Sequence, residues 1–131
     1  MGYMRDVDPY YHPEAFGLTL VAEFELAEPC YSFDTFAIWY RQDTGSYYWA
    51  NDSGCSCPAP FEDYSARSDG EGGLRVPEDR EAVLSRFNEG CFEDLVVSIG
   101  EAIRESYSPD YARKDSLPAL EKIISFQLLK N

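Results

Sequence analysis

The residues best suited to chemistry in this chain are its four cysteines and its single histidine. Cys55 and Cys57 are separated by one residue, and Cys30, Cys91 or His12 could complete four ligands around a tetrahedral zinc ion. Structural zinc sites usually have at least two residues between paired cysteines, so this spacing favours free or packed thiols. We therefore expect no cofactor, with zinc on the four cysteines as the alternative.

A cysteine nucleophile would need a base, and His12 is the only histidine in the sequence. His12 stands in a stretch without helical or strand periodicity, far from Cys55 and Cys57. Among 24 Asp and Glu residues some carboxylates must lie close together by chance, so their number identifies no acid and base pair. The sequence predicts no catalytic residue and favours a protein that is not an enzyme.

The stretch around the cysteines has the composition of an ordered turn. Asp52 and Ser53 can cap a turn with their side chains, Gly54 permits positive φ, and Pro58 stiffens the exit. We expect a structural loop that also contains Cys55 and Cys57. The alternative is a rigid loop that presents an aromatic and acidic surface to a basic partner, made of Trp49, Phe61, Glu62 and Asp63.

Three strands are expected before this loop. Strict alternation of apolar and polar residues predicts a strand over 18–26, and a second strand follows over 35–41. Turn residues at 43–45 then lead into a third strand over 46–50. The three strands and their short connections predict an antiparallel meander.

Helices are expected in the second half. Pro77 begins the first, and residues 88–90 end it. The best-marked helix covers 92–103, because its apolar residues recur at helical spacing. Ser116 is placed to cap a last helix whose apolar stripe is Leu117, Leu120, Ile123, Ile124 and Leu128, with Phe126 and Leu129 off the stripe.

The expected fold class is α+β: an N-terminal three-stranded antiparallel meander with two or three C-terminal helices packed on one face. At 131 residues the chain fits a single domain, 1–131. Its parts are an irregular arm (1–16), the sheet and cysteine loop (17–63), a glycine-rich link (64–76) and the helical half (77–131).

Large aromatic residues occupy both faces of the second and third strands. Because helices are expected on one face only, some of Trp39, Tyr47, Tyr48 and Trp49 should lie on an open face and could bind a partner. The alternative is that the N-terminal arm folds over that face and buries them.

The net charge of −13 limits the possible partners. Residues 1–65 contain 11 acids and two bases, whereas residues 66–131 contain 13 acids and nine bases. Such a field repels nucleic acid and anionic membranes and attracts a basic protein, although it also serves solubility. No stretch approaches the roughly 20 apolar residues of a membrane span, and the N-terminus is acidic where a signal peptide is basic, so a cytoplasmic protein is expected.

The run 48–63, YWANDSGCSCPAPFED, resembles the core of a family of small acidic proteins of unknown function encoded by phages of actinobacteria and by their hosts. The resemblance covers about residues 17–65 and includes Asp52, Ser53, Gly54, Cys55, Cys57, Pro58, Phe61 and Glu62. It implies a phage-encoded protein in the cytoplasm of an infected bacterium and transfers no catalytic residue.

Three functions follow as hypotheses. The first is a non-catalytic acidic protein that docks on a basic host or phage protein, as an inhibitor, an immunity-like partner or a nucleic-acid mimic would. The second is a small thiol- or zinc-dependent module built on Cys55 and Cys57. The third is a virion accessory or assembly protein that uses its last helix to oligomerise.

Overall fold

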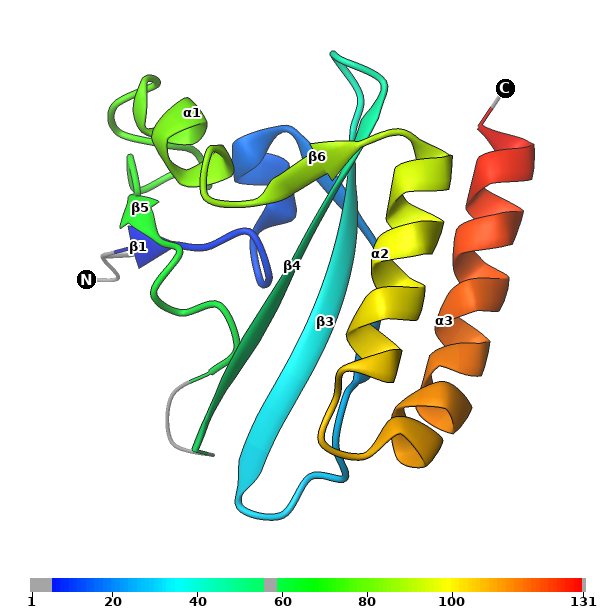
Figure 1. The fold of residues 1–131 in the computed structure, drawn as a ribbon. Helices are drawn as coiled ribbons and strands as arrows, with labels where there is room; N and C mark the ends of the chain where they lie inside the picture. The colour runs from blue at the N-terminus through cyan, green and yellow to red at the C-terminus, as the bar shows by residue number, and fades with distance from the viewer. Residues whose placement is uncertain (1–5, 56–58, 131) are drawn as a thin grey trace.

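The centre of the fold is an antiparallel sheet of four strands with the order β2-β3-β4-β6 (Figure 1). The structure, a computed structural model, describes residues 6–55 and 59–130. The strands are β2 (Leu18–Glu25), β3 (Ser32–Arg41), β4 (Ser46–Cys55) and the short β6 (Asn88–Gly90). The α+β fold and the N-terminal meander predicted from the sequence are confirmed, with β6 as an additional edge strand.

Two long helices cover one face of this sheet. They are α2 (Phe92–Arg104) and α3 (Pro109–Leu129), which run antiparallel to each other (Figure 1). Their buried side chains, including Leu95, Ile99 and Ile123, pack on Phe24, Ile38 and other residues of that face. The amphipathic pattern over 92–103 therefore correctly predicted a helix packed on the sheet.

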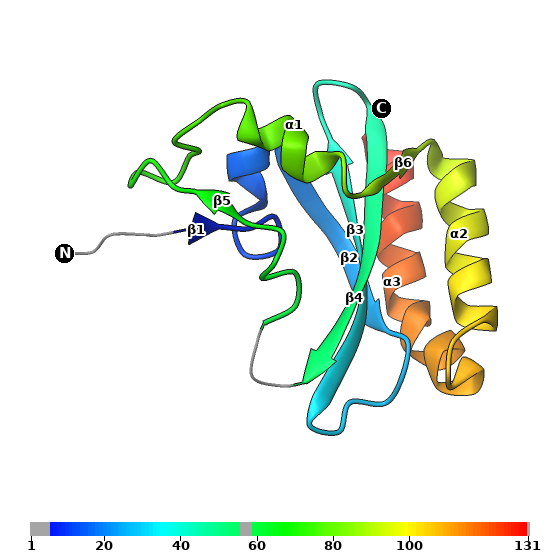
Figure 2. The ribbon, with the colours of Figure 1, turned by 60° about the vertical axis from the view of Figure 1, so that its left-hand side comes forward.

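A second layer covers the opposite face of the sheet (Figure 2). It contains β1 (Asp6–Val7), the 3-10 helix η1 (Pro13–Phe16), β5 (Ala66–Arg67) and α1 (Asp79–Leu84), and β1 pairs with β5. Val7, Phe16 and Phe61 from this layer pack against Trp39 and Tyr48. The sheet is thus the middle of three layers, and every residue from 35 to 41 is buried.

Two expected turns are strands in the structure. The third strand does not end at Ala50, because Asp52, Ser53 and Gly54 continue β4 opposite Thr35, Asp34 and Phe33. Residues 88–90, expected to end a helix, form β6 instead, so α1 ends at Leu84. In both places, pairing with a neighbouring strand overrides local turn propensity.

The last helix begins earlier than the sequence predicted. Pro109 occupies its first turn, where the missing N–H costs nothing, and the helix continues through Pro118. Ser116 does not cap it: its hydroxyl donates to the carbonyl of Arg113 from a buried position within the helix. The buried stripe is consequently Ala112, Ser116, Ala119 and Ile123, whereas Leu117, Ile124 and Leu128 are exposed.

Candidate functional site: an anchored turn with two exposed carboxylates

The aromatic side chains proposed to bind a partner are inside the protein. Tyr47 and Trp49 are buried beneath α2 and α3, and Trp39 and Tyr48 are buried by the second layer. The indole N–H of Trp39 donates to the carbonyl of Pro9 over 2.9 Å, so the N-terminal arm closes over this ring. The expectation of an open aromatic face is wrong, and the alternative, that the N-terminal arm folds over this face, is confirmed, with Phe61 and Phe87 completing the cover.

Phe61 is also buried, and it anchors a turn on the second layer. Its ring meets the edge of the Trp39 ring at a centroid distance of 5.3 Å. Its backbone N–H donates to the carboxylate of Asp52 over 2.7 Å, which ties the turn to β4. Asp52 therefore has the capping role expected from its type, but it acts from a strand.

The backbone of this turn has a conformation that few residues adopt. Phe61 has a φ of 63°, and such left-handed geometry is strained for a bulky non-glycine residue. The N–H of Tyr64 donates to the carbonyl of Phe61, and Arg86 donates to the carbonyl of Asp63 over 2.9 Å. The guanidinium of Arg86 also lies 4.2 Å from the centroid of the Tyr64 ring. The surrounding contacts thus hold the turn in one shape.

Only two residues within 59–65 are exposed, and both are acids, Glu62 and Asp63. Burial of Phe61 directly before them holds the backbone from which their side chains project. Neither carboxylate takes part in an ion pair with any described residue. The turn can therefore offer two negative charges to a cationic group from outside.

The remaining residues of the expected structural loop have other surroundings. Ser53, Gly54 and Cys55 belong to β4 and pair with residues of β3. A Cβ added to Gly54 would lie 3.3 Å from the Phe33 ring. Cys57 and Pro58 lie outside the described residues. The loop expectation for residues 52–55 is thus replaced by a strand that extends the sheet beyond its helical cover.

The cysteines do not converge within the described part of the chain. Cys30, Cys55 and Cys91 are exposed, and no group of three His, Cys, Asp or Glu side chains in residues 6–55 and 59–130 could hold a metal. Cys91 caps α2 together with Asp94. The backbone N–H of Asp94 lowers the pKa of Cys91, but hydrogen bonds from the thiol to nearby carboxylates outweigh it, so the pKa is raised. A thiol held protonated is a poor nucleophile.

Sequence reasoning missed an ion-pair cluster built on Arg41. This guanidinium, 7% exposed, lies at the end of β3, where it bonds Asp43 and Glu81 over 2.6 Å each and donates to the hydroxyl of Tyr48. Hydrogen bonds from Arg41 lower the pKa of both carboxyl groups. Because α1 carries Glu81, the cluster fastens the second layer to the sheet. The sequence signal that could have indicated this cluster is a basic residue, Arg41, at the end of a strand and two residues before an acid, Asp43.

The fold and the site together define a small three-layer α+β domain with an anchored acidic turn. The chain belongs to the family described as Domain of unknown function (DUF7574), whose model matches residues 7–108. No curated protein and no solved structure matches the chain. The matched range contains the sheet, the second layer and α2, and it ends directly before α3. Within the described ranges, no helix has the length and apolar character needed to cross a membrane.

Proposed function

We propose that this protein is a non-catalytic acidic binding protein that docks the Glu62 and Asp63 turn on a basic surface of another protein. The observation that carries the proposal is a strained turn whose buried Phe61 leaves two neighbouring carboxylates as its only exposed side chains. Strain maintained by surrounding contacts is typical of sites that need a fixed geometry.

The charge of the whole molecule supports a basic partner. Of the 24 acids, the ion pairs among described residues engage Asp43, Glu81 and Asp110. The net charge of −13 therefore produces a negative electrostatic field around the protein, and this field speeds the approach of a cationic protein. The turn supplies the local geometry, and the overall field supplies long-range attraction.

The sequence resemblance supports a place of action. The 48–63 run resembles small acidic proteins of phages that infect actinobacteria, and we place the protein in the cytoplasm of such a host during infection. An inhibitor, an immunity-like partner and a mimic of nucleic acid would each need an acidic surface of fixed shape.

The test compares two variants with the same change in net charge. Glu62→Lys with Asp63→Lys reverses the charge of the turn, and Glu101→Lys with Glu105→Lys reverses two exposed acids at the C-terminal end of α2. Each protein is immobilised in about 0.1 M salt, and basic proteins retained from an actinobacterial lysate are identified by mass spectrometry. We expect one retained protein to be lost with the turn variant and kept with the α2 variant. Equal losses would show ion exchange without a site and would contradict the proposal.

A further inference from the structure

The surface that the α2 and α3 pair turns away from the sheet contains an apolar groove. A groove of about 420 Å³ lies between the helices, lined by Phe92 and Val96 of α2 and by Leu120, Ile124 and Leu128 of α3. Gln127 is the polar residue of the lining, and its side-chain oxygen accepts a hydrogen bond from the hydroxyl of Tyr47. The groove offers no free charge to a ligand, and it suits another apolar surface.

Helix α3 carries a second stripe that the fold of one chain does not use. Asp110, Lys114, Leu117, Glu121, Ile124 and Leu128 follow one another at alternating spacings of four and three residues, and all six are exposed. Leu117 is 59%, Ile124 50% and Leu128 71% exposed. The three apolar members lie at i, i+7 and i+11, which is the spacing of a seam between two helices, and the other three members are charged. We call these six residues the α3 seam.

Gly100 of α2 is a further sign of a close neighbour. It lies beside Ile103 in a second hollow at the other end of the same helix pair, next to Pro109 and Arg113. A Cβ added to Gly100 would meet no atom within 4 Å, so the packing within one chain does not need glycine in this helix. Glycine inside a helix is unfavourable, and a closely approaching second helix would explain it.

Charge along the α3 seam selects the neighbour. Residues 109–130 contain four bases and three acids, whereas residues 1–108 contain seven bases and 21 acids. Helix α3 is thus the surface where a second chain of net charge −13 meets the least repulsion. Lys114 and Glu121 stand one on each side of Leu117, so two α3 helices in antiparallel orientation would place opposite charges together. A parallel orientation would place like charges together.

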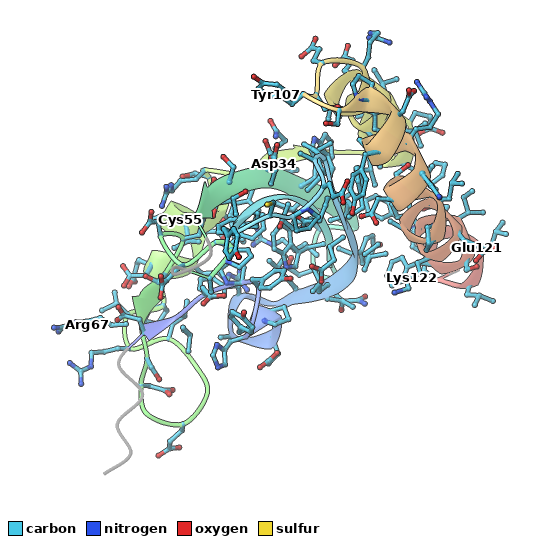
Figure 3. All side chains as sticks on the ribbon, turned by 90° about the horizontal axis from the view of Figure 1, so that it is seen from below. Asp34, Cys55, Arg67, Tyr107, Glu121 and Lys122 are labelled. Carbon is cyan, nitrogen blue, oxygen red and sulfur yellow. The ribbon has the colours of Figure 1, made fainter. Side chains whose placement is uncertain are left out.

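We propose that α3 pairs antiparallel with α3 of a second copy of this chain across a twofold axis at Leu117. With Lys114 opposite Glu121 of the second copy, Leu128 reaches the second copy's Tyr107, which is 94% exposed at the turn between α2 and α3. Figure 3 shows Tyr107 at this turn and Glu121 on α3, both projecting outward. The inference goes beyond the proposed function, since the Glu62 and Asp63 turn lies on the other side of the sheet.

The area fits a reversible dimer. A helix of 21 residues is about 30 Å long, one of 13 residues is about 20 Å long, and each is roughly 10 Å wide, so each copy offers roughly 500 Å². Two such faces bury about 1,000 Å², the low end for specific complexes, which fits a weak and reversible dimer. Because the family model ends at residue 108, the α3 seam lies beyond the matched part of the chain.

Sedimentation velocity of the full chain from about 5 to about 500 µM tests the proposal. We expect the mass to rise with concentration from 14.9 kDa to twice that value. Leu117→Glu should keep the protein a monomer, and its unchanged far-ultraviolet circular dichroism would show that the exposed position tolerates it. Gly100→Gln should raise the melting temperature, because glutamine favours a helix, yet weaken dimerisation at least about tenfold.

A charge exchange identifies the second copy and its orientation. Lys114→Glu alone and Glu121→Lys alone should each weaken dimerisation about tenfold or more, and the double variant should return to within about threefold of the original. A different partner protein would not produce this rescue. A monomer at every concentration, or a dimer indifferent to Leu117→Glu and to both charge variants, would overturn the proposal and leave the groove to another chain.

Discussion

Arg41 is a buried cation whose two carboxylate partners remain in contact with water. Its position at the end of β3 allows it to reach Tyr48 on β4 and Glu81 on α1 at the same time. The ion pair therefore has a structural role: it holds α1 against the sheet. Arg80 makes longer ion pairs of 3.3 and 3.4 Å to the same acids from a more exposed position.

Arg41→Met should lower the free energy of unfolding at pH 7 by about 1–3 kcal/mol, because Tyr48 loses a partner in a buried site. Arg80→Met, the matched control, should cost less than about 0.5 kcal/mol. Urea unfolding followed by tryptophan fluorescence measures both. If the two variants lost equal amounts of unfolding free energy, the burial of Arg41 would not determine its contribution to stability.

The same pair of variants predicts a pH dependence. Arg41 lowers the pKa of Asp43 from 3.8 and of Glu81 from 4.5, so its stabilisation is complete above those values and is lost as the pH falls through the lowered ones. The difference in stability between the original protein and Arg41→Met should therefore shrink on acidification below about pH 4. A constant difference from pH 7 to pH 3 would contradict this account.

Residue types predicted some roles and not others. Asp52 was expected to accept a backbone N–H, and it does, but its acceptor role depends on a strand that places it beside Phe61. The left-handed backbone of Phe61 could not be predicted, because tertiary contacts and not its own preference select it. The burial of Trp39 likewise depends on an arm that has no regular pattern.

At the scale of elements, the sequence predicted those whose periodicity is clean. α2 follows its pattern of 3.6 residues. β2 is a strand as predicted, but a register shift between Leu20 and Ala22 interrupts its alternation: Leu18 packs with the second layer, whereas Ala22 and Phe24 pack with the helices. Helix α3 was misjudged because three of its large apolar residues, Leu117, Ile124 and Leu128, are on an exposed stripe and not on the buried one. Small residues, Ala112, Ser116 and Ala119, allow α3 to lie close to β2, and their size gave no strong hydrophobic signal.

Adjacent isoleucines on α3 give a matched test of this assignment. Ile123 is 1% exposed and Ile124 is 50% exposed. Ile123→Ala should lower the free energy of unfolding by about 2–4 kcal/mol through a cavity against the sheet. Ile124→Ala should cost less than about 1 kcal/mol at concentrations where the chain is a monomer. Urea titrations at about 2 µM measure both, and similar costs would mean that the two stripes of α3 are wrongly assigned.

At the scale of the molecule, the surplus negative charge opposes folding and the pairing of two copies, and it favours binding to a basic protein. Within one chain, unpaired acids repel one another and oppose the compact state. Between two copies, the net charges also repel, although residues 109–130, with four bases and three acids, are close to neutral. Between this chain and a basic protein, the field attracts.

Salt should therefore stabilise the fold. Raising sodium chloride from about 20 to about 500 mM shortens the screening length from roughly 20 to roughly 4 Å, which removes most repulsion between separated acids. We expect the melting temperature to rise by several degrees, since about 1 kcal/mol corresponds to about 3–6 °C for a chain of this size. Differential scanning calorimetry at a concentration that keeps the chain monomeric measures it.

Sodium sulfate at the same ionic strength separates screening from exclusion of the salt from the protein surface, since only the second effect favours sulfate. Screening also predicts that salt strengthens the pairing of α3 helices and weakens docking of the Glu62 and Asp63 turn on a basic protein. A melting temperature that falls with sodium chloride would mean that the ion pairs of Arg41, together with the 2.9 Å pair of Arg113 with Asp110, outweigh the repulsion. The acidic side chains would then be neutralised in part by basic side chains of the same chain. Less unpaired negative charge would be left for a partner than the composition indicates.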